Sequence, residues 1–286
     1  MFEQELETAV RLARLAGKTI LEHYAEEIIA EEKFGVDNLS EPVTAADRAA
    51  SRIIVDGLLD AFPHDGILSE EEIDLPDGRL SKRRVWIIDP IDGTWGFVKR
   101  DGDFAVQIGL AVDGEPVLGV VFVPLTDKLY FASQGDGSYL STNGGAAESL
   151  QVSDITDFSE MSVAVSRNHP NPRMKQLNEH FGFASQVQRG GIGVKVGLIV
   201  ERECDVYINL SPRSKFWDTC GPQAIMEEAG GKLTDIFGEP IRYDIGDVQN
   251  YNGIIACSEA AHSLITEKLR PLLNDIGRQK LKAKAV

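Results

Sequence analysis

The sequence predicts an α/β fold in which helices and sheets lie in layers. Near the N-terminus, apolar residues recur at helical spacing, whereas from residue 66 short apolar runs end at acidic residues, as strands do when they lead into a site. After residue 145, predicted strands and helices alternate along the chain. This alternation is typical of layered α/β proteins.

The first half, residues 1–145, is expected to form an α+β unit. Positions 3–32 predict one long amphipathic helix, and a second helix is predicted after Pro42, with Thr44 as its N-cap and an end near Pro63. The strand regions expected next are 66–69, 85–88, 104–123 as a pair around the Asp113-Gly114 turn, and 128–142 as a meander.

The second half, residues 146–286, is expected to alternate strands with helices after a boundary near residues 143–150. The predicted elements are strand 161–165, helix 171–181, strand 185–188, helix 193–202, strand 205–209 and helix 219–229. The last nine residues are basic and predict a frayed, solvated end.

Composition limits the partners of the chain. The 45 acidic and 29 basic residues give a net charge of -16, which disfavours a nucleic-acid polymer or an anionic membrane surface. The longest apolar stretch, near 117–125, is interrupted by Gly119 and Pro124 and is too short to cross a bilayer. The acidic N-terminus lacks an export signal, and the three cysteines match neither a zinc nor a redox spacing. Together these features predict a cytoplasmic protein.

Asp89 and Asp92 are the first candidate metal ligands. They lie three residues apart, after a predicted strand, and the turn can offer both carboxylates and the Ile91 carbonyl to a hard cation such as Mg²⁺. If Gly93 and Thr94 begin a helix, their amides would bind phosphate beside the metals. Taken alone, this segment is better explained as an ordinary Asx turn.

Two further acids strengthen the metal hypothesis. Glu70 follows the preceding strand and could bridge two cations, and Asp218 lies where a late helix is predicted to begin. Taken singly, Glu70 is typical of solvated surface and Asp218 of an N-cap. The four acids together could hold Mg²⁺ ions about 4 Å apart for phosphoryl transfer. Thr94 and Asp47 are candidates to orient and deprotonate a water, although Asp47 could instead support the first turn of its own helix.

Covalent catalysis is not indicated. The five histidines are scattered, and no Gly-x-Ser-x-Gly segment accompanies them. The glycines at 190–193 match neither a P-loop nor a dinucleotide fingerprint and predict a tight turn, beside which Lys195 could meet a second phosphate.

In combination, these segments resemble the inositol monophosphatase superfamily, with an acid after a central strand, Asp-Pro-Ile-Asp-Gly-Thr, and Trp-Asp before a late helix. The resemblance implies a layered αβαβα fold like that of inositol monophosphatases and fructose-1,6-bisphosphatases. It also implies a homodimer, lithium sensitivity and about two or three Mg²⁺ ions per site. The implied metal ligands are Glu70, Asp89, the Ile91 carbonyl, Asp92 and Asp218, and the implied water-activating pair is Asp47 and Thr94.

The C-terminal half is most similar to the 3'(2'),5'-bisphosphate nucleotidases, through residues 166–169, 191–195 and 211–220. The resemblance implies removal of the 3'-phosphate from 3'-phosphoadenosine 5'-phosphate, a small substrate of sulfur metabolism. The implied substrate contacts are Gly93, Thr94, Ser166, His169, Lys195 and Asp218.

Ser211 and the Trp95-Gly96 pair bear on the choice of substrate. Inositol monophosphatases carry an acid at the position of Ser211, which counts against inositol. Many bacterial nucleotidases show Lys-Glu where this chain has Trp95-Gly96. The alternative is therefore an inositol-1-monophosphatase or a related small sugar phosphatase, and a noncatalytic metal-binding domain or a two-metal nuclease is less favoured.

Overall fold

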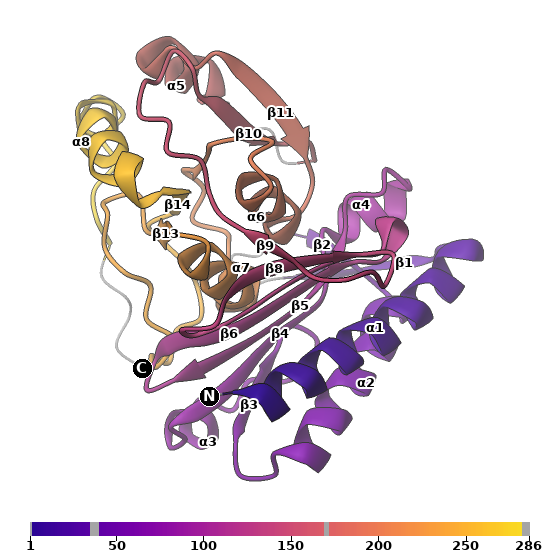
Figure 1. Ribbon diagram of the computed structural model, residues 1–286. Helices are drawn as coiled ribbons and strands as arrows, with labels where there is room; N and C mark the ends of the chain where they lie inside the picture. The colour runs from indigo at the N-terminus through magenta and orange to yellow at the C-terminus, as the bar shows by residue number, and fades with distance from the viewer. Residues whose placement is uncertain (1, 35–39, 169–171, 282–286) are drawn as a thin grey trace.

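The computed structural model describes residues 2–34, 40–168 and 172–281, and within them it shows two main sheets with helices between and outside them (Figure 1). The larger sheet has the strand order β3-β4-β5-β6-β7-β8-β9. β3 and β4 are parallel, and each later strand is antiparallel to the one before it. Its strands are β3 Gly66–Ser69, β4 Arg84–Asp92, β5 Ala105–Val112, β6 Glu115–Val123, β7 Lys128–Ser133, β8 Gly137–Thr142 and β9 Glu148–Leu150.

Two helices, α1 (Glu3–Ala25) and α2 (Ala45–Ala61), cover the outer face of the larger sheet (Figure 1). Their apolar faces pack with strand residues into one buried cluster, in which Ile20, Ile54 and Trp86 are fully shielded from solvent. Burial of side chains of this size contributes roughly 1.5–3 kcal/mol each, which holds both helices on the sheet.

The prediction of a single helix over 3–32 is wrong in its last turns. α1 ends at Ala25, and β1 (Ala30–Phe34) pairs antiparallel with β2 (Ser40–Thr44). The helical spacing of the sequence is overridden here by hydrogen bonds to a strand that comes later in the chain. The second predicted helix is confirmed as α2, with Thr44 at its N-cap.

The middle layer consists of α6 (Ile192–Val200) and α7 (Phe216–Glu228), which lie between the two main sheets (Figure 1). The packing is close because a Cβ at Gly119 would lie 2.1 Å from the Gly221 carbonyl oxygen. Glycine at this position therefore lets the α7 backbone rest directly on β6. The adjoining core contains residues from both sheets, which joins the two halves of the chain into one packed body.

The smaller sheet has the order β11-β10-β12-β14-β13, and its outer face is covered by α5 (Met174–Phe181) and α8 (Glu259–Asp275). The five layers are α1 with α2, the larger sheet, α6 with α7, the smaller sheet, and α5 with α8. They confirm the predicted αβαβα fold. No element was predicted for β13, β14 or α8. The strands are β10 Ser162–Ser166, β11 Ser185–Arg189, β12 Val206–Asn209, β13 Gly231–Thr234 and β14 Ile254–Ser258.

Short helices complete the chain: α3 Pro76–Leu80, α4 Thr94–Lys99 and a 3-10 turn at Pro124–Thr126. Among the helices of the described residues, none has both the length and the apolar character needed to cross a membrane. Cys204, Cys220 and Cys257 are buried and free.

Candidate active site

Asp89 and Asp92 lie at the end of β4, which continues past the predicted end at residue 88. Between these two acids β4 advances three residues while its partner β5 moves only two, from Gln107 to Ala105. On a regular strand, side chains three residues apart point to opposite faces of the sheet. A bulge inserts one extra residue, so the second side chain points to the same face as the first. The bulge therefore turns both carboxylates toward the same side of the sheet.

Asp218 joins these acids from the other half of the chain. α7 begins at Phe216, three residues before the predicted start, so Asp218 lies in the first turn instead of at the N-cap. Its Oδ2 accepts a hydrogen bond of 2.5 Å from the Lys215 main-chain nitrogen. Carboxylate oxygens of Asp89, Asp92 and Asp218 all lie within 4.8 Å of one another.

The electrostatics of this acid cluster fit a cation. Burial, followed by repulsion from Glu70 and the neighbouring aspartates, raises the pKa of Asp89 well above its ordinary value. Burial and repulsion from Asp92 and Glu70 do the same to the pKa of Asp218. Asp89 Oδ1 is shielded from solvent and has no hydrogen-bond partner among the residues described. Buried carboxylates without compensation are costly, and hard cations such as Mg²⁺ take oxygen ligands of this kind.

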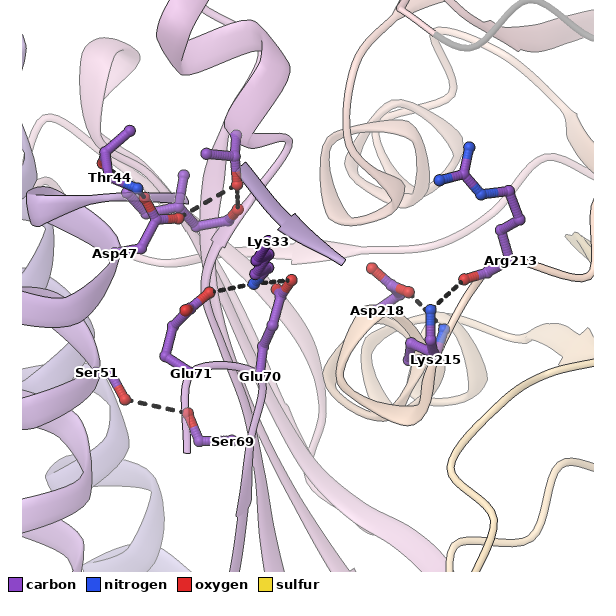
Figure 2. A network of polar contacts seen from close by, with 12 residues as sticks. Lys33, Thr44, Asp47, Ser51, Ser69, Glu70, Glu71, Arg213, Lys215 and Asp218 are labelled. Carbon is purple, nitrogen blue, oxygen red and sulfur yellow. Dashed lines mark hydrogen bonds and ion pairs between the residues drawn. The ribbon is translucent and has the colours of Figure 1, made fainter. Parts of the chain in front are cut away.

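Glu70 and the Ile91 carbonyl border the same cluster. Glu70 follows β3, and its Oε1 lies 2.7 Å from Lys33 Nζ, which also lies 2.5 Å from Glu71 Oε1 (Figure 2). Burial lowers the pKa of Lys33, but the charges of Glu70 and Glu71 outweigh this effect and raise it. The Ile91 carbonyl oxygen accepts a hydrogen bond of 3.1 Å from Thr94 Oγ1. Lys33, on β1, is a residue that the sequence analysis missed.

Asp47 contacts both its own helix and Thr94, the two partners that the sequence analysis considered for it. Its Oδ2 accepts hydrogen bonds from the Thr44 main-chain nitrogen at 2.8 Å and from Thr44 Oγ1 at 2.6 Å, which caps α2. Its Oδ1 lies 3.2 Å from Thr94 Oγ1, whose single hydroxyl hydrogen is shared between Asp47 and the Ile91 carbonyl. Burial raises the pKa of Asp47 to about 6, against the lowering effect of the Thr44 hydrogen bonds. One carboxylate thus supports its helix with one oxygen and meets Thr94 with the other.

Thr44→Val is expected to move the acid limb of the pH–activity profile to higher pH. The Thr44 hydroxyl stabilises ionised Asp47, so its loss raises the pKa of Asp47 further. A base with a raised pKa loses its ionised form earlier as the pH falls. The measurement is the pH dependence of kcat/KM between pH 5 and 9, with Thr44→Ser, which keeps the hydroxyl, as the control. An unchanged limb in Thr44→Val would contradict the hypothesis that Asp47 acts as a general base.

The first turn of α6 packs against Asp92. Gly193 N donates a hydrogen bond of 2.7 Å to Asp92 Oδ2, and a Cβ at Gly191 would lie 2.6 Å from the same oxygen. Gly191 also has φ +55°, so the glycines here serve this close approach.

Lys195 Nζ lies 4.8 Å from the centre of the Tyr207 ring. Burial lowers the pKa of Lys195 to about 8, although the charges of Asp92 and other acids oppose this shift.

A cavity of about 680 Å³ collects most of the predicted residues, a size common for small-molecule sites. Asp47 is not among its lining residues but contacts it through Thr94, and His169 lies outside the described residues. The predicted residues that line the cavity are Glu70, Asp89, Ile91, Asp92, Gly93, Thr94, Ser166, Lys195 and Asp218.

Three arginines that line this cavity, Arg173, Arg213 and Arg278, were missed. Arg213 lies within a segment that the sequence analysis had already singled out, 211–220, where its charge was the available signal.

The prediction of a frayed end is wrong for residues 278–281. Arg278 Nη2 donates a hydrogen bond of 2.6 Å to the Tyr251 carbonyl, and Leu281 N donates one of 2.8 Å to Asn252 Oδ1.

The cavity brings together a cluster of carboxylates, a hydroxyl paired with a carboxylate, and cationic side chains. This combination defines a class of enzyme, the metal-dependent hydrolases of phosphate esters. A model of the inositol monophosphatase family matches residues 1–274. The chain belongs to the inositol monophosphatase family, and the resemblance stated from the sequence is confirmed. It is therefore a phosphatase of that family.

Individual relatives agree with this assignment. The 3'(2'),5'-bisphosphate nucleotidase CysQ of Escherichia coli (strain K12) is 34% identical over 238 residues, which cover 83% of this chain and 93% of the relative. A crystal structure of CysQ from Bacteroides thetaiotaomicron superposes with a TM-score of 0.76 at 31% identity and covers 90% of this chain and 98% of that one. An IMPase from Thermotoga maritima gives a TM-score of 0.79 at 25% identity, with 96% of this chain and 100% of that chain covered.

Proposed function

We propose that this phosphatase removes the 3'-phosphate of 3'-phosphoadenosine 5'-phosphate in a Mg²⁺-dependent reaction. The observation that carries the proposal is the cluster of buried Asp89 and Asp92 with partly buried Asp218, beside the Asp47–Thr94 pair. The nucleotide is favoured because relatives 31–35% identical are named bisphosphate nucleotidases. Ser211, which lines the cavity, brings no carboxylate to bind the hydroxyls of inositol.

The residues that would hold the metal are Glu70, Asp89, Asp92, Asp218 and the Ile91 carbonyl. Their oxygen donors and uncompensated negative charge suit Mg²⁺, and the proposal includes about two or three ions per site. When bound, Mg²⁺ would supply Lewis-acid stabilisation of the negative charge on the phosphoryl group.

Asp47 and Thr94 would activate the water that attacks phosphorus. Thr94 Oγ1 can hold the water by accepting a hydrogen bond from it, while Asp47 receives the released proton by way of the Thr94 hydroxyl. A base with a pKa of about 6 is ionised at neutral pH and still accepts a proton.

Gly93, Ser166 and Lys195 are proposed to position the substrate. Gly93 lines the cavity with φ +89°, and a Cβ there would lie 2.5 Å from the Asp103 carbonyl oxygen, so this turn, whose main chain would bind phosphate, requires glycine. Lys195 would contribute positive charge beside the substrate, and Ser166 a hydroxyl hydrogen bond.

The direct test is phosphate release with Mg²⁺ from 3'-phosphoadenosine 5'-phosphate, inositol 1-phosphate and fructose 1,6-bisphosphate at equal concentrations. We expect the nucleotide to give the highest kcat/KM, by about tenfold or more, and Li⁺ to inhibit its hydrolysis. A clear lead for inositol 1-phosphate or fructose 1,6-bisphosphate would overturn the nucleotide proposal and support the alternative of a sugar phosphatase. Light scattering on the same sample tests the proposed homodimer, and cell fractionation tests the proposed cytoplasmic location.

A further inference from the structure

The cavity has a positively charged wall in addition to the carboxylate cluster. Arg173 precedes α5, Arg213 precedes α7 and Arg278 follows α8, yet all three line the same cavity as Asp89 and Asp218. The chain carries a net charge of -16, so three arginines from separate segments facing one cavity are not explained by composition. We call these three residues the arginine wall.

Residues 249–252 support the segments that carry two of these arginines, Arg213 and Arg278. Gln249 Nε2 donates a hydrogen bond of 2.6 Å to the Pro212 carbonyl, and Asn250 N donates one of 2.8 Å to the Ser214 carbonyl. Tyr251, the next residue, accepts a hydrogen bond of 2.6 Å at its carbonyl oxygen from Arg278 Nη2. The loop before α7 and the segment after α8 are therefore fixed against one shared support.

The C-terminal segment is also anchored on both sides of Arg278. Arg278 N donates a hydrogen bond of 2.8 Å to the Leu273 carbonyl at the end of α8. Beyond it, Leu281 exchanges main-chain hydrogen bonds of 2.8 and 3.0 Å with the Asn252 side chain. Arg278 is thus placed by contacts of its neighbours and does not need a ligand to reach the cavity.

Charge and hydrogen bonding at Arg278 favour an anion. Arg278 Nε is shielded from solvent and has no hydrogen-bond partner within the described part of the chain. Burial, followed by the positive charge of Arg173, lowers the pKa of Arg278. Two neighbouring arginines repel each other, and a negatively charged ligand in the cavity would relieve this repulsion and form hydrogen bonds with them.

Lys195 lines the cavity from α6, the helix whose first turn packs against Asp92. The acids that act on Lys195 include Asp92 and Asp218, two members of the metal-binding cluster. By contrast, the charge that acts most on Arg278 is that of another arginine. The cavity is therefore lined by cationic side chains from two different segments, Lys195 on α6 and Arg278 after α8.

We infer that Arg278 and Arg173 form a second anion subsite, which binds the 5'-phosphate that remains on the nucleotide after the 3'-phosphate is removed. This inference rests on the proposed function, because the reacting phosphate must lie at the carboxylate cluster. A cavity of about 680 Å³ has room for a nucleoside with two phosphates. Residues after α8 thus contribute to substrate selection, in place of the frayed end expected from the sequence.

The test compares two ligands that differ by one phosphate, adenosine 3',5'-bisphosphate and adenosine 3'-monophosphate. Dissociation constants are measured by calorimetry with Ca²⁺ in place of Mg²⁺, so that binding is measured without relying on turnover. In Arg278→Gln we expect affinity for the bisphosphate to fall about tenfold and affinity for the monophosphate to change less than about twofold. Arg173→Gln should act in the same direction, and Arg278→Lys should restore part of the affinity.

Lys280→Gln is the matched control, because Lys280 lies two residues away and pairs with Glu239 outside the cavity lining. The inference is overturned if Arg278→Gln weakens both ligands equally or neither, or if the unmodified protein binds the two equally. The proposed function is judged separately, by phosphate release from the bisphosphate with Mg²⁺. Tight, Arg278-dependent binding without that release would refute the reaction and leave the subsite standing.

Discussion

Asp89→Asn is expected to reduce Mg²⁺-dependent phosphate release by about 10³-fold or more, because it removes one ligand from a site where bound cations stabilise the transition state. The same change should not lower the melting temperature of the metal-free protein. Asp89 is buried beside Asp92 and Asp218, and its Oδ1 lacks a hydrogen-bond partner among the described residues. Removing one of several buried like charges relieves repulsion, so the metal-free variant should be as stable as the parent or more so.

Thermal unfolding with and without Mg²⁺ checks both parts of this prediction. The parent protein should gain stability when Mg²⁺ is added, since a ligand that binds only the folded state raises the melting temperature. In Asp89→Asn this gain should be lost or much reduced. Asp60→Asn, an exposed aspartate on α2, is the control and should behave as the parent does. Full activity in Asp89→Asn would refute the metal site.

The acids of the site were predictable because each follows or begins a predicted element. Asp89 and Glu70 come directly after apolar runs, and strands that end near one another in a sheet bring such residues together. The orientation of Asp92 was not predictable, because it depends on a bulge that is defined only by pairing with β5.

The residues that were missed are those placed by contacts between distant parts of the chain. Lys33 reaches Glu70 from a strand that residues 30–34 form with 40–44, whereas the local pattern predicted helix as far as residue 32. Arg278 lies in a polar, basic segment that is typical of a free end, and its position depends on the carbonyl of Tyr251. Local periodicity contains no information about either contact.

Asp47→Asn is expected to lower kcat by about 10³-fold while Mg²⁺ binding is retained, a pattern opposite to that of Asp89→Asn. Asn keeps an oxygen that can accept the hydrogen bond of the Thr44 main-chain nitrogen, so the cap of α2 should survive. What Asn cannot do is accept a proton from the Thr94 hydroxyl, which donates to Asp47 Oδ1 in this structure. The loss of rate therefore reports on water activation and not on folding or metal affinity.

Thr94→Val provides the matched comparison, because it removes the hydroxyl of the same pair and leaves Asp47 in place. If the two residues act as a unit, each single variant and the double variant Asp47→Asn/Thr94→Val should lose nearly the same factor in kcat, since groups that act together are not additive. Losses that multiply would mean that Asp47 and Thr94 act independently. In that case Asp47 contributes through the electrostatics of the cavity, and the attacking water must be activated by another group.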